Sequence, residues 1–273
     1  ARKVATAILG QLSATAGDAG REERKATVAK IKADWAAQLA TMDHEADDPG
    51  TTWNERAQKA DPDKVTSRMA WRAIVEGLPE DVIISSDIGN SCALGAAYPS
   101  FEKGRKYLAP GMFGPCGYGF PAICGAKIGQ PDVPVVGFAG DGAFGISMNE
   151  MTACGREDWP AVTMVIFRNY HWGAEKRNTT LWYNDNFVGT ELDRNVSYAG
   201  IAKACGLEGV QVKSMAEITE AIKTATRLQM EEGKTTFIEI LTNMELGEPF
   251  RRDAMKKPVE VAGISKDDMR PQK

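Results

Sequence analysis

The sequence predicts an α/β protein built on a doubly wound parallel sheet. Short runs rich in β-branched residues alternate along the chain with helical stretches, as in sheets that carry helices on both faces. Two of these runs, 133–139 and 161–167, are apolar nearly throughout, as expected of strands buried on both sides. The chain has 273 residues, which is enough for one large domain or two modest ones.

The N-terminal part precedes this alternation. Apolar residues at helical spacing predict helices over 1–40 with a break at 16–20, and the acidic, turn-rich stretch 41–62 is typical of a linker with a short helix inside. The first residue is not Met and the opening lacks the layout of a signal peptide. We therefore expect the chain to be the C-terminal part of a longer polypeptide.

The alternating pattern covers residues 63–245, which we predict to be one domain, followed by a charged tail over 246–273. Strands are expected at 81–87, 133–139, 161–167, 209–212 and 235–241. Helices are expected at 63–78, 118–129, 148–156, 197–205 and 215–232.

Composition argues against several kinds of partner. The 33 Lys and Arg residues against 37 Asp and Glu give a net charge of −4, whereas nucleic-acid binders usually carry a basic excess. No run of about 18 apolar residues predicts a membrane span. The 5 cysteines form no C-x-x-C pair and only 2 histidines exist, which disfavours a zinc site. We expect no nucleic acid and no membrane as partners, and reduced thiols in a cytoplasmic protein.

The loop after the run 133–139 reads GDGAFG at 140–145, which is also the G-x-G-x-x-G pattern of dinucleotide-binding folds. Such a site needs an acidic residue at the end of the next strand to hold the ribose. The next run ends instead in Arg168 and Asn169. Arg168 is compatible with a 2′-phosphate, so an NAD(P)-binding oxidoreductase remains an alternative.

Asp141 favours a metal-assisted phosphate site at this loop. Its carboxylate would repel a pyrophosphate unless a divalent cation lay between them. Asn169 follows 28 residues later at the end of the neighbouring predicted strand, so both side chains would meet at one edge of the sheet. A backbone carbonyl at His171 would complete the protein ligands of Mg²⁺, and the amides of Gly142 and Ala143 at the helix start would hold phosphate oxygens.

The G-D-G motif with the spaced Asn169 and the following Gly173 resembles the thiamine-diphosphate signature, and Glu150 and Pro160 match its acetolactate-synthase-like branch. The resemblance implies the thiamine-diphosphate-binding fold, pyrophosphate-binding domain. It implies thiamine diphosphate and Mg²⁺ as cofactors. The metal ligands implied are Asp141, Asn169 and His171.

Two further blocks agree with this family. Residues 111–122, GMFGPCGYGFPA, resemble its G-x-M-G-x-G-L-P-A segment, which implies that the Gly114 carbonyl holds the aminopyrimidine and that Cys116 bends the cofactor. Relatives often carry Met or Leu at the latter position, and a small thiol packed in a turn would explain Cys116 equally. The loop SDIGNS at 86–91 matches the segment for the far end of the diphosphate, although a polar helix cap is an equal reading. The implied cofactor-binding residues are Asn90, Ser91, Gly114, Cys116, Gly140, Asp141, Gly142, Ala143 and Asn169.

The stretch RNYHWGAEKRN at 168–178 is the most particular part of the chain and resembles the sulfoacetaldehyde acetyltransferase family. That family converts sulfoacetaldehyde and phosphate to acetyl phosphate and sulfite. The cationic side chains of this stretch are candidates for the sulfonate or the phosphate, with a solvated loop as the alternative. They are Arg168, His171, Lys176 and Arg177, and His171 is the best candidate for a substrate contact.

Family members are about twice as long as this chain. The resemblance therefore implies that 1–40 ends a middle domain and that a pyrimidine-binding domain, with the glutamate that activates the cofactor, lies elsewhere. No catalytic acid is assigned in this chain. A homodimer or homotetramer is implied, with the pyrimidine-binding domain completing the site. The alternatives are acetolactate synthase, a 2-oxo-acid decarboxylase, the NAD(P)-binding oxidoreductase, and a non-catalytic α/β module.

Overall fold

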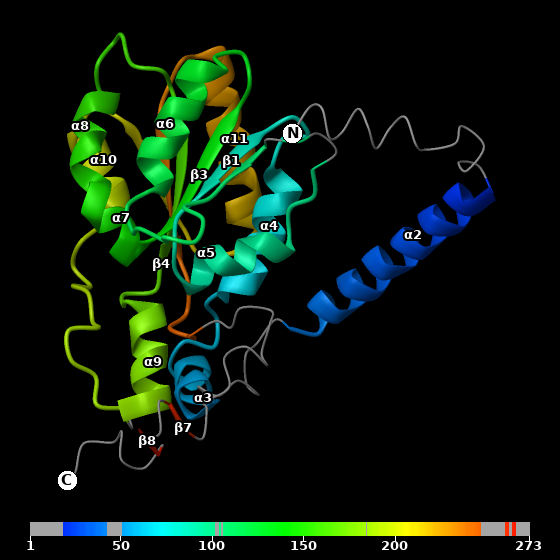
Figure 1. Cartoon of the computed structure of the whole chain (residues 1–273). Coiled ribbons are helices and arrows are strands. Elements are labelled where there is room, and N and C mark those ends of the chain that lie inside the picture. Colours follow the sequence, from blue (N-terminus) through cyan, green and yellow to red (C-terminus); the bar gives the residue numbers. More distant parts are fainter. Residues whose placement is uncertain are drawn as a thin grey trace. The chain divides into compact units, whose positions relative to one another are not determined.

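The computed structural model describes residues 19–42, 51–101, 104, 106–183, 185–246, 260–261 and 264–265. The chain divides into two compact units, Ala1–Asp43 and His44–Lys273 (Figure 1). The described part of the first unit is the helix α2 (Ala19–Ala40) and the turn after it. This helix agrees with the second of the two predicted helices, and the first lies outside the described residues. The assignment of 1–40 to a middle domain stays a prediction.

The second unit is built on a six-stranded parallel sheet of order β2-β1-β3-β4-β6-β5. Its strands are β1 (Ile83–Ser86), β2 (Tyr107–Leu108), β3 (Val135–Gly140), β4 (Thr163–Arg168), β5 (Glu208–Val212) and β6 (Thr236–Leu241). The five predicted strands are confirmed. The two-residue strand β2 is too short to produce a hydrophobic pattern, so the sequence does not predict it.

Helices connect the strands of this sheet. They are α4 (Ser67–Gly77), α5 (Asn90–Leu94), α6 (Gly119–Gly129), α7 (Asp141–Ser147), α8 (Met151–Cys154), α9 (Gly173–Tyr183), α10 (Tyr198–Ala204) and α11 (Met215–Glu231). Two single-turn 3₁₀ helices, η1 (Gly95–Ala97) and η2 (Met148–Glu150), extend α5 and precede α8. The predicted helices are confirmed, although the one at 148–156 is split between η2 and α8. The helix start expected at Gly142 and Ala143 is confirmed as α7. The helices α5 and α9 are additional, and each begins in a loop that the sequence assigns to ligand binding.

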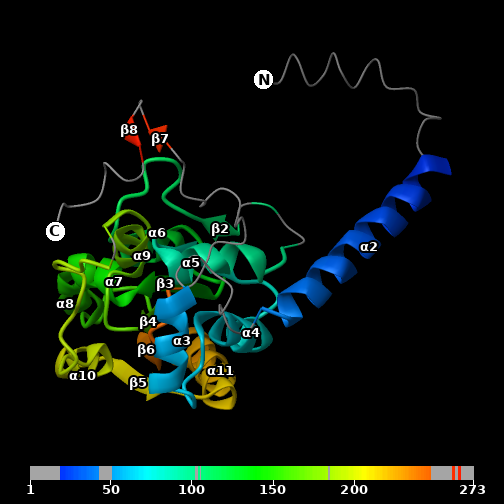
Figure 2. The ribbon, with the colours of Figure 1, turned by 90° about the horizontal axis from the view of Figure 1, so that it is seen from below.

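The sheet is covered on both faces, as the doubly wound prediction requires. Alternate side chains of each strand enter different cores: Val136 and Phe138 pack under α4 and α11, whereas Val135 packs with α6, α7 and α10. Figures 1 and 2 show α4 and α11 on one side of the sheet and α6 and α10 on the other. The alternation explains why the central runs are apolar at every position.

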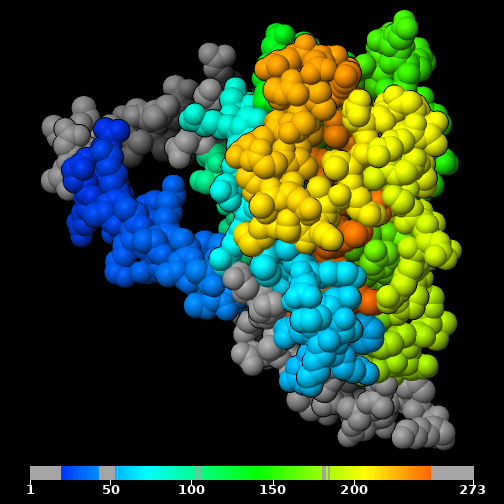
Figure 3. Space-filling view, turned by 180° about the vertical axis from the view of Figure 1, so that it is seen from behind, coloured from blue at the N-terminus to red at the C-terminus, as the bar shows by residue number. Residues whose placement is uncertain are grey.

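The predicted linker contains the helix α3 (Thr51–Ala60), which belongs to the second unit and packs against the rest of it. The indole Nε1 of Trp53 donates to the carbonyl of Met244 at 2.7 Å, and its ring meets the ring of Phe187 edge-on at 5.4 Å. Figure 3 shows α3 in light blue against the lower part of this unit. This stretch therefore has a structural role of its own beyond connecting two parts of the chain.

The order of the strands brings three loops to one edge of the sheet. The strands β1, β3 and β4 are neighbours, and Ser86 pairs with Phe138 while Gly140 pairs with Phe167. The three strands are parallel, so the loops that follow them lie side by side. These loops carry the block 86–91, the motif at 140–145 and Asn169, while the glycine-rich block 111–122 follows β2, the other neighbour of β1.

Of the predicted tail 246–273, the structure describes residue 246 and the short antiparallel pair β7 (Glu260–Val261) and β8 (Ile264–Ser265). The remaining tail residues lie outside the described part of the chain. Within the described residues, no helix combines the length and the apolar character that crossing a membrane would require. All 5 cysteines are free thiols.

Candidate functional site

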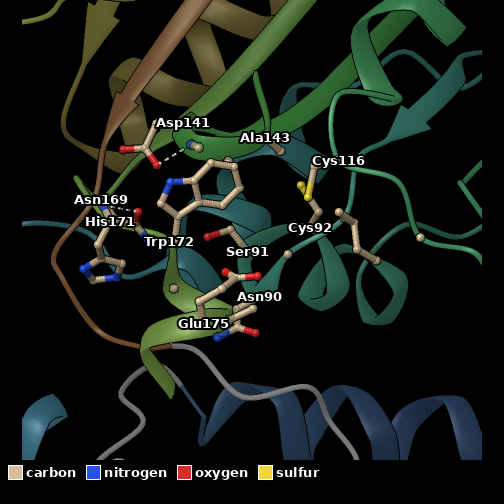
Figure 4. Close-up of a pocket in the computed structure, with 17 residues that line it drawn as sticks. Asn90, Ser91, Cys92, Cys116, Asp141, Ala143, Asn169, His171, Trp172 and Glu175 are labelled. Carbon is tan, nitrogen blue, oxygen red and sulfur yellow. Dashed lines mark hydrogen bonds between the residues drawn. The ribbon is translucent and has the colours of Figure 1, made fainter. Parts of the chain in front are cut away.

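A pocket opens at the edge of the sheet where β1, β3 and β4 end (Figure 4). It is lined by every residue that the sequence assigns to cofactor or metal binding: Asn90, Ser91, Gly114, Cys116, Gly140, Asp141, Gly142, Ala143, Asn169 and His171. The other lining residues are Ile88, Gly89, Cys92, Trp172, Gly173, Ala174 and Glu175. Motifs that lie far apart in the sequence thus form one site, while the role of each residue stays a prediction.

Asp141 is the first residue of α7, and its side chain is 1% exposed. The two carboxylate oxygens have different surroundings. Oδ2 accepts hydrogen bonds from Arg168 Nη1 at 2.9 Å and from the amide of Tyr170 at 2.7 Å, whereas Oδ1 accepts the amide of Gly142 at 3.0 Å. Burial raises the pKa of Asp141 to about 6, and the bonds from Tyr170 and Arg168 oppose that rise. Oδ2 thus accepts two hydrogen bonds from the protein, whereas Oδ1 retains a lone pair that is available to a ligand.

The side-chain amide of Asn169 lies between Asp141 and the backbone of His171. With its nitrogen turned inward, it donates to the His171 carbonyl at 3.1 Å and to Asp141 Oδ1 at 3.2 Å. With its oxygen turned inward, three oxygen atoms face one another, and only a cation among them would offset their repulsion. Adjacent ligands of Mg²⁺ at about 2.1 Å are roughly 3 Å apart in an octahedron. The spacing and the chemistry of these three groups fit that ion.

The side chain of His171 has a different role from its carbonyl. The imidazole is 2% exposed, is directed away from the pocket in Figure 4, and meets the ring of Trp53 edge-on at 6.3 Å. Burial and the nearby charges of Lys176 and Arg194 lower the pKa of His171 to about 3. This placement disfavours the predicted substrate contact of the imidazole and leaves the carbonyl as the group available at the pocket.

Two other cations of the 168–178 stretch are buried against carboxylates. Arg168 pairs with Asp141, and its Nε lies 3.6 Å from Glu239 Oε1. Lys176 pairs with Glu191 and lies 3.7 Å from the centre of the Trp53 ring. Neither side chain lines the pocket, which disfavours both as candidates for a contact with substrate anions. The placement of Arg168 also leaves the NAD(P) alternative without a 2′-phosphate partner.

Arg177, the remaining cation of that stretch, is also buried. It does not line the pocket either. A hydrophobic pattern does not reveal the direction of a charged side chain, so the sequence could not separate these buried ion pairs from a basic pocket wall.

Asp87 connects the block 86–91 with the glycine-rich block 111–122, and it was assigned no role from the sequence. Its carboxylate accepts the amides of Ile88 at 2.8 Å, Gly117 at 3.1 Å and Gly119 at 2.6 Å. Burial raises the pKa of Asp87, and these three hydrogen bonds oppose the rise. An aspartate directly after a buried strand is the signal that could have indicated such a clamp.

The glycine-rich segment held by Asp87 carries Gly114 and Cys116. Gly114 and Gly117 have positive φ angles of 58° and 84°, which L side chains rarely adopt. A Cβ at Gly119 would lie 2.8 Å from the Phe138 carbonyl, so this segment approaches β3 closely. Burial raises the pKa of the Cys116 thiol.

Trp172 and Glu175 also line the pocket and were not assigned a role from the sequence. A Cβ on Gly142 would lie within 2.8–3.0 Å of three ring atoms of Trp172, so the second glycine of the G-D-G motif accommodates this indole. Glu175 lies in the first turn of α9, and Figure 4 shows its carboxylate directed into the pocket on the side of Asn90. Neither residue belongs to a spaced motif, so only the fold identifies them.

Comparison with known proteins agrees with the pocket chemistry. Residues 87–240 match the family model described as thiamine pyrophosphate enzyme, C-terminal TPP binding domain. A sulfoacetaldehyde acetyltransferase of Roseovarius nubinhibens is 70% identical over 272 residues, covering 100% of this chain and 45% of that protein. An acetolactate synthase of Mycobacterium avium is 25% identical over 193 residues, covering 69% of this chain and 29% of that protein.

Among solved structures, a thiamine diphosphate-dependent 4-hydroxybenzoylformate decarboxylase of Rhodococcus jostii RHA1 superposes with a TM-score of 0.60 at 21% identity. The match covers 68% of this chain and 34% of the decarboxylase, and it supports the fold. The chain spans about half the length of curated relatives that it matches, 45% in the case of the Roseovarius protein.

Proposed function

Because the chain belongs to the thiamine pyrophosphate enzymes and contains their C-terminal cofactor-binding domain, we propose that it supplies the pyrophosphate and Mg²⁺ half of a sulfoacetaldehyde acetyltransferase. The whole enzyme would convert sulfoacetaldehyde and phosphate to acetyl phosphate and sulfite. The 70% identity with the Roseovarius enzyme over the full chain is the observation that carries this proposal. The 25% identity with an acetolactate synthase makes that alternative the weaker one.

In this proposal Mg²⁺ is held by Asp141 Oδ1, the amide oxygen of Asn169 and the carbonyl of His171. The support is their mutual spacing of 3.1 and 3.2 Å around the Asn169 amide. The first amides of α7 have no main-chain acceptor within the helix, and that of Gly142 donates to Asp141 Oδ1 at 3.0 Å. We assign the amides of Gly142 and Ala143, after the turn at Gly140, to the diphosphate oxygens.

The other pocket walls would hold the rest of the cofactor. Asn90 and Ser91 lie at the start of α5 and line the pocket, which supports a contact with the far end of the diphosphate. Gly114 and Cys116 line the opposite wall, where the Gly114 carbonyl would accept from the aminopyrimidine. Cys116 would support the bent form of the cofactor.

Thiamine diphosphate, when bound, supplies the carbon nucleophile and the electron sink of the reaction. The residues of this chain bind and orient it. The aldehyde carbon of the substrate ends as an acyl carbon, and the carbon that bore the sulfonate ends as a methyl group. We assign the activating glutamate to the pyrimidine-binding domain, outside this chain.

The assembly is proposed to be a homodimer or homotetramer in which a pyrimidine-binding domain completes the site. Exposed apolar side chains beside the pocket support a further contact there: Met112 and Phe113 are almost fully exposed on the glycine-rich segment. We also propose a cytoplasmic location, which is supported by the 5 free thiols.

The test is a calorimetric titration of the full-length protein with thiamine diphosphate, with and without Mg²⁺. We expect binding that requires Mg²⁺, and a loss of at least 100-fold in affinity in Asp141→Asn. Asp158→Asn is the control, because Asp158 is exposed and pairs with Arg156 on the surface. If the affinity for thiamine diphosphate is the same without Mg²⁺ and in Asp141→Asn, the proposed site is wrong.

The choice of reaction is tested separately by the products. Sulfite release from sulfoacetaldehyde that requires inorganic phosphate is expected from the acetyltransferase. Condensation of pyruvate without sulfite release would instead identify the acetolactate synthase alternative.

A further inference from the structure

Arg168 makes an unusual contact for the site proposed above, because its guanidinium binds the carboxylate that would hold the metal. Arg168 is the last residue of β4, and Nη1 donates to Asp141 Oδ2 at 2.9 Å. Both side chains are 1% exposed. The oxygen that faces Arg168 is not the one that faces Asn169 and His171, so the carboxylate is divided between a resident cation and the pocket.

The guanidinium is fixed from several directions. Its Nη2 donates to the carbonyls of Asp193 and of Val196, the latter at 3.1 Å. The rings of Tyr170 and Tyr198 lie 4.4 and 5.2 Å from its central carbon. A group held in this way cannot turn aside when a second cation enters, so its charge is a permanent part of the site.

The guanidinium of Arg168 and the carboxylates on either side of it sum to a formal charge of −1. Arg168 lies between the carboxylates of Asp141 and Glu239, the latter 3.6 Å from Nε. Glu239 is itself held by Ser197 Oγ at 2.9 Å and the Ala199 amide at 3.2 Å. A divalent ion that arrives alone therefore meets one carboxylate already paired with a cation, and repulsion from Arg168 lowers its affinity.

We propose that Arg168 is a positioning residue for Asp141 that makes the site dependent on the diphosphate. It orients the carboxylate with Oδ1 toward the pocket. Its fixed charge disfavours a divalent cation that comes without phosphates, whereas the negative charge of the diphosphate restores the attraction. The inference rests on the proposed metal site. It adds a physical reason why binding of the divalent cation and binding of the diphosphate should strengthen each other.

The experiment measures Mn²⁺ binding to the metal-free, full-length protein by the electron paramagnetic resonance of free Mn²⁺, with and without thiamine diphosphate. The ratio of the two dissociation constants gives the coupling. Arg168→Gln removes the charge and keeps a polar side chain, and Glu239→Gln removes the opposing charge behind it. Arg156→Gln is the control for the loss of one positive charge at the surface, where Arg156 pairs with Asp158.

We expect Arg168→Gln to bind Mn²⁺ alone at least tenfold more tightly than the unchanged protein and to show a smaller coupling. Glu239→Gln should weaken the binding of Mn²⁺ alone and increase the coupling, and the increased coupling tests the proposal even if Arg168→Gln does not fold. A purely structural role would weaken Mn²⁺ binding in both variants without increasing the coupling in Glu239→Gln; that result, or an unchanged coupling in both, overturns the inference. Absence of Mn²⁺ binding to the unchanged protein even with thiamine diphosphate would instead refute the proposed function.

Discussion

Gly142 packs against the indole of Trp172, and this contact gives a second reason, besides phosphate binding, for a glycine at this position of the G-D-G motif. A phosphate-binding amide needs only a backbone, but a Cβ at this position would meet the ring at 2.8 Å. Trp172 also lines the pocket, so moving its ring changes the wall of the site. The second glycine therefore serves packing as well as any ligand.

We predict that Gly142→Ala weakens the binding of thiamine diphosphate with Mg²⁺ by at least tenfold, because the displaced indole enters the pocket. Gly125→Ala is a matched control within α6, since a Cβ there meets nothing within 4 Å. That control should raise the free energy of unfolding by about 0.5–1 kcal/mol, as alanine does in a helix interior. Calorimetry and thermal unfolding measure the two effects, and equal affinities in the two variants would contradict the role of Trp172.

At the residue scale, the sequence predicted the groups that belong to spaced motifs. Asp141, Asn169 and the two glycine-rich turns could be found because their chemistry follows directly from their order in the chain. Asp87 and Trp172 could not, since each acts on a segment at least 30 residues away. Arg168 and Lys176 stayed candidates for substrate contact, because spacing does not show in which direction a long cationic side chain extends.

The loop after β1 and the glycine-rich segment before α6 behave as one element because Asp87 joins them. Of the three amides that it accepts, that of Gly119 is buried and those of Ile88 and Gly117 are partly buried, so the buried one in particular would otherwise be left without a partner. Leaving such a group unsatisfied costs about 1–3 kcal/mol. The position of Gly114 and Cys116 therefore depends on a residue that does not itself line the pocket.

We predict that Asp87→Ala lowers the affinity for thiamine diphosphate by 10- to 100-fold and also lowers the melting temperature. Gln229→Ala is the matched control, because the Gln229 amide is another buried clamp: it binds both backbone groups of Val135, at the opposite end of β3. It should lower stability and leave cofactor affinity unchanged. If both variants lose cofactor affinity in proportion to their stability, Asp87 has no specific role at the pocket.

Among the elements, those with a repeated pattern were predictable and the short ones were not. The helices α4 and α11 have clear hydrophobic periods, and β3 and β4 are continuous apolar runs. The helix α7 has 7 residues and begins at Asp141, so the metal-site motif and the helix start share the same letters of the sequence. α5 is shorter still, with 5 residues, too few to establish a period.

At the scale of the whole molecule, the site is one half of what the proposed reaction needs. This chain corresponds to 45% of the Roseovarius relative, and no described residue is assigned to activate the cofactor. We predict that the purified 273-residue chain releases no sulfite from sulfoacetaldehyde in the presence of phosphate and both cofactors. Turnover by this chain alone, measured as acetyl phosphate, would show that the assignment of the glutamate to another domain is wrong.

Cofactor binding should also be visible as stability of the full-length protein. A ligand at 100 times its dissociation constant stabilises the native state by about 2.7 kcal/mol when it does not bind the unfolded chain. We expect thiamine diphosphate to raise the melting temperature only when Mg²⁺ is present, and a chelator to abolish the increase. An increase that survives the chelator would argue against a metal-bridged diphosphate.

The arrangement of β1, β3 and β4 has a consequence for how the protein matures. Each wall of the pocket follows a different strand, and the strands pair across crossover segments that separate them widely along the chain. Such nonlocal pairings form slowly because the loops between them must close first. An early folding intermediate would then lack part of the pocket. We therefore expect the cofactor to bind in the last stage of folding, after the three strands have paired, and not to direct the first stage.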